Sequence, residues 1–251
     1  MIDLRLQVDS RDVQALQRAQ EAGIAVIACT GRPYPGALPW IRRLGLRDPF
    51  VCYQGAQVRT VEGEVLFERD IEHAVATEVI LFCRGRGIHV HGYRDDRLLV
   101  ERERPEARAY AAHSGMDIHL VPDLDRALGS STPKLVIVAS ADEVERLLPE
   151  VRARWEHRLF VTTSLPTYLE LTDVRADKRR ALDFIARKPG IAAEDAVAVG
   201  DGRNDAPMLE WAGLGVAVEG APEELVRLAD RVIPPPGSGG IAKLVDQLWG
   251  S

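Results

Sequence analysis

Apolar and polar positions follow helical and extended patterns in turn along the first part of the chain. A helical pattern that Ser10 can cap ends at Gly23, directly before the apolar run IAVIAC at 24 to 29. Pro33 begins the next predicted helix, and FVCYQGAQV at 50 to 58 predicts a second strand that runs into a turn. Alternation of helices with buried strands favours a parallel sheet.

The pattern changes in the middle of the chain. A predicted helix is followed by IHVHGY, a turn at Asp95 and Asp96, and RLLVERE, which together predict a β-hairpin. The strand KLVIVA at 134 to 139, a further helix, and the segments LFVTT and TYLELT continue this mixed character. We therefore expect residues 72 to 172 to form an inserted α+β domain with antiparallel strands.

The parallel pattern returns after Asp173. Apolar strands AVAVG, LGVAV and RVI are separated by short helical segments, and a last helix ends at Trp249. Residues 1 to 71 and 173 to 251 are thus expected to form one α/β core domain interrupted by the inserted one.

Composition narrows the class of protein. The 251 residues are 46% hydrophobic and 28% charged, as in globular proteins, and the length corresponds to about one and a half average domains. The net charge of −6 lacks the basic footprint of nucleic-acid binding. Three cysteines rule out a complete disulfide framework, and no apolar run approaches the ~20 residues that span a bilayer. We expect a cytoplasmic protein without nucleic-acid or membrane partners.

Two polar clusters follow predicted buried strands, where ligands collect in open parallel sheets. In the first, CTGRP, a hydroxyl at Thr30 and backbone N–H groups beside Gly31 suit a phosphate, although a turn residue and a capping threonine would look the same. In the second, VAVGDGRNDAPML, Asp201 and Asp205 flank a glycine turn and can hold a hard cation such as Mg²⁺. The alternative for this cluster is an exposed Asp-Gly turn with an aspartate cap.

Two further features are weaker on their own. Lys178 begins a helix just after the inserted domain, where a surface lysine is the ordinary explanation. Beside a phosphate and a cation, its charge would neutralise charge that develops in a reaction. His89 and His91 share one face of a strand, but without further ligands they are interpreted as packed or solvated histidines.

The order of these motifs resembles a known family. TGR, a YQGA turn, an inserted α+β domain, a lysine, GDGRNDAPML and GVAVEGAPEELVRLAD occur in the order found in Cof-type hydrolases of the haloacid dehalogenase (HAD) superfamily with a type IIB cap. The resemblance covers nearly the whole chain from Asp9 onward. It implies a HAD-like Rossmannoid three-layer sandwich with a parallel sheet, plus an inserted α+β cap domain.

The resemblance also implies roles for individual residues. Thr30 and Lys178 match the phosphate-binding threonine and lysine, Gly31 belongs to the same loop, and Asn204 would contact the substrate phosphate. Asp201 and Asp205 match the metal-binding acids. The implied activity is a Mg²⁺-dependent phosphatase that acts on small phosphorylated metabolites through an aspartyl-phosphate.

One motif of the family does not occur in the sequence. Relatives carry DxDGT at the end of their first strand, where the first aspartate attacks phosphorus and the second is the general acid and base. Neither Asp3 nor Asp9 has a second aspartate two residues later or a glycine turn. We expect this motif to precede Met1, the chain without it to be inactive and less stable, and residues 2 to 8 to lie outside the centre of the sheet.

Two alternatives to a phosphatase remain at the level of the sequence. A non-catalytic sensor of phosphate ligands would keep Thr30, Lys178 and Asp201 without the nucleophile. A Rossmann dehydrogenase fits less well, because no GxGxxG follows an early strand. These patterns do not determine whether the substrate is a sugar phosphate, a nucleotide or a cofactor phosphate. They do not determine the oligomeric state either.

Overall fold

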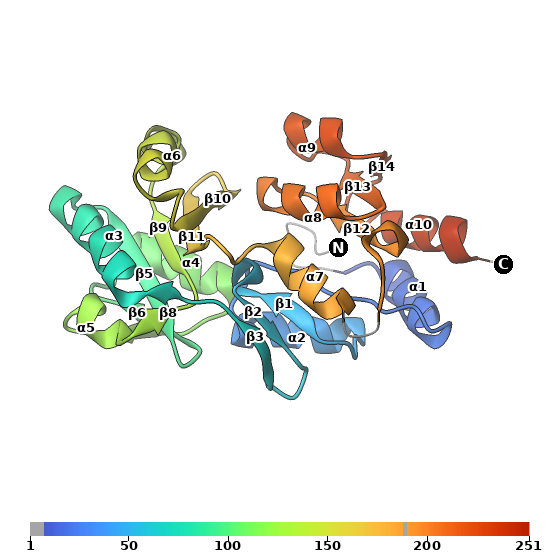
Figure 1. Cartoon of the computed structure of the whole chain (residues 1–251), viewed down its shortest axis with the longest axis horizontal. Helices are drawn as coiled ribbons and strands as arrows, with labels where there is room; N and C mark the ends of the chain where they lie inside the picture. Colours follow the sequence, from blue (N-terminus) through green and yellow to red (C-terminus); the bar gives the residue numbers. More distant parts are fainter. Residues whose placement is uncertain (1–7, 188–189, 251) are drawn as a thin grey trace.

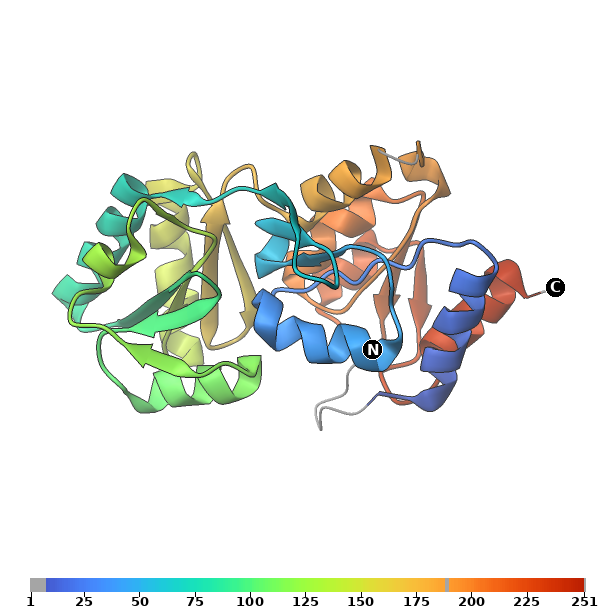
Figure 2. The same cartoon turned by 90° about the horizontal axis from the view of Figure 1, so that it is seen from below.

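The computed structural model describes residues 8–187 and 190–250. These residues form two lobes, and the chain crosses between the lobes twice (Figure 1). One lobe combines the N-terminal and C-terminal parts of the chain, and the middle of the chain forms the other (Figure 2). Within the described ranges no helix is long and apolar enough to cross a membrane. We call the two lobes the core and the cap.

The core alternates helices and strands much as the sequence predicts. Its helices are α1 (Ser10–Glu21), α2 (Tyr34–Leu44), α7 (Lys178–Arg187), α8 (Ala206–Trp211), α9 (Glu223–Leu228) and α10 (Gly240–Trp249). Its strands are β1 (Phe50–Cys52), β2 (Gln57–Arg59), β3 (Val65–Glu68), β12 (Val197–Gly200), β13 (Leu214–Val218) and β14 (Arg231–Ile233). Three single 3₁₀ turns complete it: η1 (Tyr53–Gly55), η2 (Ala193–Asp195) and η3 (Arg203–Asp205). The residue that caps α1 is Asp9 rather than the predicted Ser10, because its carboxylate accepts the N–H of Arg11 at 2.9 Å.

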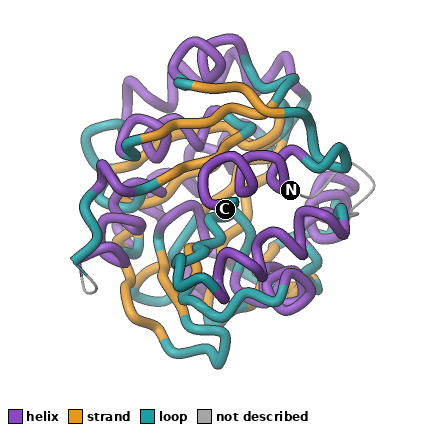
Figure 3. Tube along the Cα trace, turned by 90° about the vertical axis from the view of Figure 1, so that its right-hand side faces the viewer, coloured by secondary structure: helices purple, strands orange, loops and turns teal. Residues whose placement is uncertain are grey.

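Successive strand residues of the core face two different layers of helices. Phe50 and Cys52 of β1 pack with Val216 of β13 against α1, α2 and α10. Val51, between the first two, points to the opposite face and packs with Ala181 of α7. The strands β12, β13 and β14 are parallel, as expected, whereas β1, β2 and β3 pair antiparallel, because short turns join them. The whole lobe has helices on both faces of its strands (Figure 3).

The prediction of a strand at residues 24 to 29 is wrong. Its only described pairing is a single parallel bridge between Cys29 and Val51, and its apolar side chains are mostly half-buried. β12 pairs with β13 alone, and among residues 8–187 and 190–250 no strand pairs with its other edge. A buried parallel strand needs partners on both sides, so this apolar run stays irregular. The expectation for residues 2 to 8 falls on residues 1–7, which lie outside the described part of the chain.

The cap is a six-stranded sheet covered by helices. Its strand order is β10-β11-β9-β5-β6-β7, with β5 (His89–Arg94), β6 (Arg97–Val100), β7 (Ile118–Leu120), β9 (Leu135–Val138), β10 (Leu159–Leu165) and β11 (Tyr168–Asp173). The small strands β4 (Ile71–Glu72) and β8 (Ser131–Thr132) pair separately. Its helices are α3 (His73–Arg86), α4 (Pro105–Ser114), α5 (Leu124–Leu128) and α6 (Ala141–Trp155). The predicted hairpin β5–β6 is confirmed, and β6 with β7 is the one parallel pair of this sheet.

The chain enters the cap beside Asp70 and returns to the core after Asp173. A cap boundary at residues 72 to 172 stays our proposal, since β4 and β11 lie at these crossings. At the first crossing one carboxylate oxygen of Asp70 accepts the Ser131 hydroxyl at 2.7 Å, and the other is buried without a partner among the described residues. Burial raises the pKa of Asp70 to about 6. The hydrogen bond from Ser131 lowers the pKa, whereas the nearby carboxylates of Glu68 and Asp173 raise it.

This carboxyl group predicts a pH dependence of stability. Between pH 4 and 6 the unfolded chain releases the Asp70 proton while the folded chain keeps it, so the stability contributed by Asp70 should fall as pH rises through this window. We expect Asp70→Asn to raise the free energy of unfolding at pH 8 by roughly 1–2 kcal/mol and to change it little at pH 4. Urea unfolding at both pH values measures this, and an equal gain at both would contradict it.

Candidate functional site

The turn Tyr53–Gly55 connects the predicted site loops. Both Tyr53 and Gln54 have left-handed backbone, with φ of 51° and 60°, a conformation that costs free energy outside glycine. This turn brings backbone donors to the TGR loop: the N–H of Tyr53 donates to the carbonyl of Arg32 at 2.9 Å, and that of Gln54 donates to the carbonyl of Thr30 at 3.3 Å. The strained turn therefore fixes the first predicted cluster against the end of β1.

Gln54 joins the first cluster to the second. Its Oε1 accepts the side-chain amide of Asn204 at 2.9 Å, and the side chain is 1% exposed. Gly31 lies directly against it, because a Cβ at that position would lie 2.2 Å from Gln54 Nε2. This Nε2 is buried and has no hydrogen-bond partner within the described ranges. A side chain at position 31 would therefore displace the end of the Gln54 side chain, and Gln54 Nε2 is an unused donor beside the loop.

Lys178 is brought to the same place by a second close approach. A Cβ at Gly55 would lie 2.3 Å from the Asp177 carbonyl carbon and 2.8 Å from the Lys178 nitrogen, so the start of α7 packs on the turn. The Lys178 side chain is buried and pairs with the carboxylate of Asp205. The surface-lysine interpretation of Lys178 is therefore wrong.

The two acids of the second cluster have different surroundings. Asp205 accepts the N–H groups of Asp201 and Gly202 at 2.9 and 3.0 Å through one oxygen, while its other oxygen faces Lys178. Asp205 is buried and organises the loop, whereas Asp201 is exposed at the loop's surface. The alternative of an exposed Asp-Gly turn with an aspartate cap agrees with the exposed Asp201 and the bonds to Asp205, but it does not account for the buried charge pair of Asp205 with Lys178.

The electrostatics of the site favour an anion at Lys178 and disfavour a cysteine nucleophile. Burial by itself lowers the pKa of Lys178, but the carboxylate of Asp205 outweighs it and the net pKa is raised, so the ammonium stays charged. Burial raises the pKa of the Cys29 thiol to about 12, against the opposing effect of Lys178. Cys29 is thus a neutral thiol at neutral pH, and a thiol is a poor nucleophile.

The residues that could hold a divalent cation have suitable ligand atoms, but they are few in number. Mg²⁺ prefers oxygen ligands, needs only one or two protein carboxylates and keeps several waters. Asp201 offers a carboxylate of this kind, with Asp205 beside it in the same loop. Among the residues that the structure describes, no group of three or more His, Cys, Asp or Glu side chains could hold a metal.

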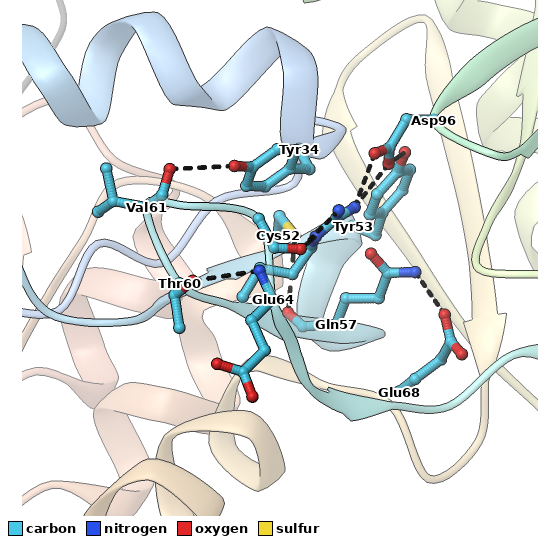
Figure 4. Close-up of polar contacts among 11 residues, drawn as sticks. Tyr34, Cys52, Tyr53, Gln57, Thr60, Val61, Glu64, Glu68 and Asp96 are labelled. Carbon is cyan, nitrogen blue, oxygen red and sulfur yellow. Dashed lines mark hydrogen bonds and ion pairs between the residues drawn. The ribbon is translucent and has the colours of Figure 1, made fainter.

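The cap packs closely on the core beside this site. Strand β10 contacts η3, which carries Asn204 and Asp205. At the tip of the β5–β6 hairpin, Asp96 accepts the hydroxyl of Tyr53 at 3.0 Å and the guanidinium of Arg59 at 2.8 Å (Figure 4). The turn that organises the site therefore also anchors the cap.

Some polar groups of this region carry no clear signal in the sequence. Gln54 follows an apolar strand and precedes a glycine, a position that many turn residues share. Lys134, which is fully buried, stands before an apolar strand like an ordinary strand-start residue.

The two histidines of β5, His89 and His91, are buried, and His89 Nε2 lies 3.2 Å from His91 Nδ1. This arrangement agrees with packed histidines.

Comparison with known proteins identifies the family. A family model described as haloacid dehalogenase-like hydrolase matches residues 2–245. The chain belongs to this family. The expected fold class is confirmed: a HAD-like hydrolase core with an inserted cap, and the protein is a hydrolase.

Relatives of this HAD-like hydrolase include enzymes named as phosphatases. The HMP-PP phosphatase of Serratia proteamaculans is 26% identical over 88% of this chain and 81% of its own. A crystal structure from Thermotoga maritima has a TM-score of 0.84 at 27% identity and covers 98% of this chain and 93% of its own. A solved HAD subclass IIB sugar phosphatase shares the fold with a TM-score of 0.82 at 21% identity, over 96% and 92% of the two chains.

Proposed function

We propose that this HAD-like hydrolase is a phosphatase of small phosphorylated metabolites and that the described site binds their phosphate group. The observation that carries this proposal is the buried, charged Lys178 in one cluster with Asn204, Asp205 and the Thr30 loop. A permanently charged ammonium in a buried site is costly unless it meets anions. The names of the relatives, HMP-PP phosphatase and sugar phosphatase, agree with a small phosphate ester as the substrate.

Each residue has a distinct task in this proposal. The Thr30 hydroxyl and the Gly31 N–H donate to phosphate oxygens, and the absence of a side chain at Gly31 lets the phosphate approach the backbone. The Lys178 ammonium neutralises charge on the phosphate, and the Asn204 side-chain amide orients it by a hydrogen bond. Asp205 holds Lys178 and the loop of Asp201 in position.

A divalent cation, Mg²⁺, would be held by Asp201 with Asp205 in the same loop. When bound it supplies positive charge that stabilises phosphate oxygens. By resemblance, the attacking group is an aspartate that forms an aspartyl-phosphate. The DxDGT motif that carries it in relatives does not occur in the sequence, so a phosphate sensor without turnover is the second candidate.

Binding of inorganic phosphate in the presence of Mg²⁺, measured by isothermal titration calorimetry, tests the proposed site. We expect Thr30→Val and Asn204→Ala each to weaken binding about tenfold or more, since each removes a hydrogen bond to a charged group. Asp201→Asn should remove the Mg²⁺ dependence of binding. As a matched control, Thr60→Val removes a hydroxyl that bonds Glu64 N–H in a distant turn and should leave binding unchanged.

Hydrolysis of p-nitrophenyl phosphate separates the two candidate functions. Phosphate binding without turnover, both in this chain and in one preceded by DxDGT, would support the sensor. Wild-type affinity for phosphate in Thr30→Val and Asn204→Ala would contradict the proposed site.

A further inference from the structure

A buried lysine of the cap reaches across to the phosphate loop of the core. Lys134, directly before β9, is fully buried, and its Nζ donates to the carbonyl of Gly31 at 2.7 Å. It also donates to Glu170 Oε2 at 2.7 Å and to the hydroxyl of Tyr110 at 3.2 Å. These three acceptors match the three hydrogens of an ammonium, so Lys134 has no donor left for a substrate.

The Gly31 carbonyl belongs to the same peptide group as the N–H of Arg32. The peptide is planar and trans, since the described chain contains no cis peptide bonds, so its carbonyl and N–H point in opposite directions. Lys134 therefore fixes the direction of the Arg32 N–H when it holds the carbonyl. That N–H donates to Thr30 Oγ1 at 3.1 Å.

This arrangement decides which way the Thr30 hydroxyl can donate. An Oγ1 that accepts the Arg32 N–H keeps its own O–H free to point to another acceptor. Charge on Lys134 strengthens the bonds that follow it in the chain of hydrogen bonds, because ionised donors make stronger bonds and linked bonds polarise one another. Burial by itself lowers the pKa of Lys134, but the Glu170 carboxylate outweighs it and the net pKa is raised.

We propose that the Lys134–Glu170 pair of the cap is a positioning device for phosphate binding, which acts on the Thr30 hydroxyl through the Gly31–Arg32 peptide. The inference rests on the proposed function of Thr30. The path runs from Glu170 to Lys134, the Gly31 carbonyl, the Arg32 N–H and Thr30 Oγ1. The cap thus sets phosphate affinity without touching the phosphate.

A purely structural role for the pair would have different consequences. A buried ion pair whose only effect is on cap stability would lower the unfolding midpoint when broken, without a specific effect on the Arg32 N–H. Tyr93 provides the matched control, because it lies in the same buried cluster and its hydroxyl donates to Tyr110 at 2.6 Å. Within residues 8–187 and 190–250, the Tyr93 side chain makes no hydrogen bond to the core loop.

The test uses the full chain with two readouts. The first is hydrogen exchange of the Arg32 amide, resolved by NMR, and the second is the dissociation constant of inorganic phosphate with Mg²⁺. We expect Lys134→Met to speed exchange at Arg32 and to weaken phosphate binding by about tenfold or more. Tyr93→Phe should change neither readout, even where it lowers the unfolding midpoint.

A second variant keeps the proposal testable if Lys134→Met unfolds the protein. Lys134→Met leaves Glu170 buried without its partner, whereas Lys134→Met combined with Glu170→Met removes both charges and is better tolerated. We expect the double variant to fold and to show the same faster exchange and weaker binding as the single one. A folded double variant with wild-type exchange at Arg32 would overturn the proposal.

The outcomes also separate this inference from the proposed function. If Thr30→Val weakens phosphate binding and the Lys134 variants do not, the phosphate site stands and the positioning role fails. If Thr30→Val leaves binding unchanged, the phosphate site itself is contradicted and the positioning role for phosphate fails with it. The Arg32 exchange rate then still shows whether Lys134 holds the peptide.

Discussion

Replacement of Lys178 by methionine should weaken inorganic phosphate binding by about tenfold to a hundredfold, because it removes a charged donor from the site. It should also lower the free energy of unfolding by about 3–5 kcal/mol, since the carboxylate of Asp205 stays buried without its partner. Calorimetric titration and urea unfolding measure the two effects on the same samples.

A second variant separates the two effects. Lys178→Met combined with Asp205→Asn removes the unpaired charge, so stability should partly return while phosphate binding stays weak. Arg187→Met provides a control on the same helix, because its ion pair with Asp183 is exposed and should contribute under about 1 kcal/mol. Wild-type phosphate affinity in the folded double variant would show that Lys178 has only a structural role.

Addition of an apolar strand ending in DxDGT ahead of Met1 should raise the midpoint of thermal unfolding by more than about 10 °C. The reason is that among residues 8–187 and 190–250 no strand pairs with the second edge of β12, and residues 24 to 29 make a single bridge. An added parallel strand would supply the missing partner. Each buried N–H or carbonyl that gains a partner stabilises the fold by roughly 1–3 kcal/mol. The same addition should produce turnover of p-nitrophenyl phosphate that EDTA abolishes.

The control for this experiment keeps the strand and removes the chemistry. Replacement of the first aspartate of the added motif by asparagine should preserve the gain in midpoint and abolish turnover. Equal midpoints with and without the addition, both cooperative, would contradict the pairing argument. Turnover by the chain without the addition, lost in Asp201→Asn, would show that another nucleophile exists in the protein.

The comparison of predicted and observed elements shows where local patterns are reliable. The hairpin around Asp95 and Asp96 follows from a turn pair that tolerates left-handed backbone, with observed φ of 49° and 59°. The strand expected at 24 to 29 has an equally clear apolar pattern and fails. Strand formation depends on neighbours in the sheet, and the run of side chains does not reveal them.

The site shows the same division. Thr30, Asp201 and Asp205 could be selected from the sequence because each follows a predicted strand of a parallel sheet. Lys178 was ambiguous, since only its burial against Asp205 separates it from a surface lysine. Gln54 and Lys134 could not be selected, because their partners are 150 and 103 residues away along the chain.

The sequence by itself determined the α/β class, the insertion of a cap, the family and the polar residues at the strand ends, because these depend on periodicity and on motifs with short spacing. The tertiary structure decided which of these residues meet, that Lys178 is buried and charged, and that a cap lysine holds the Gly31 carbonyl. Contacts between distant segments depend on how the lobes pack. Burial sets how strongly a charge interacts with its neighbours, and it exists only in the packed protein.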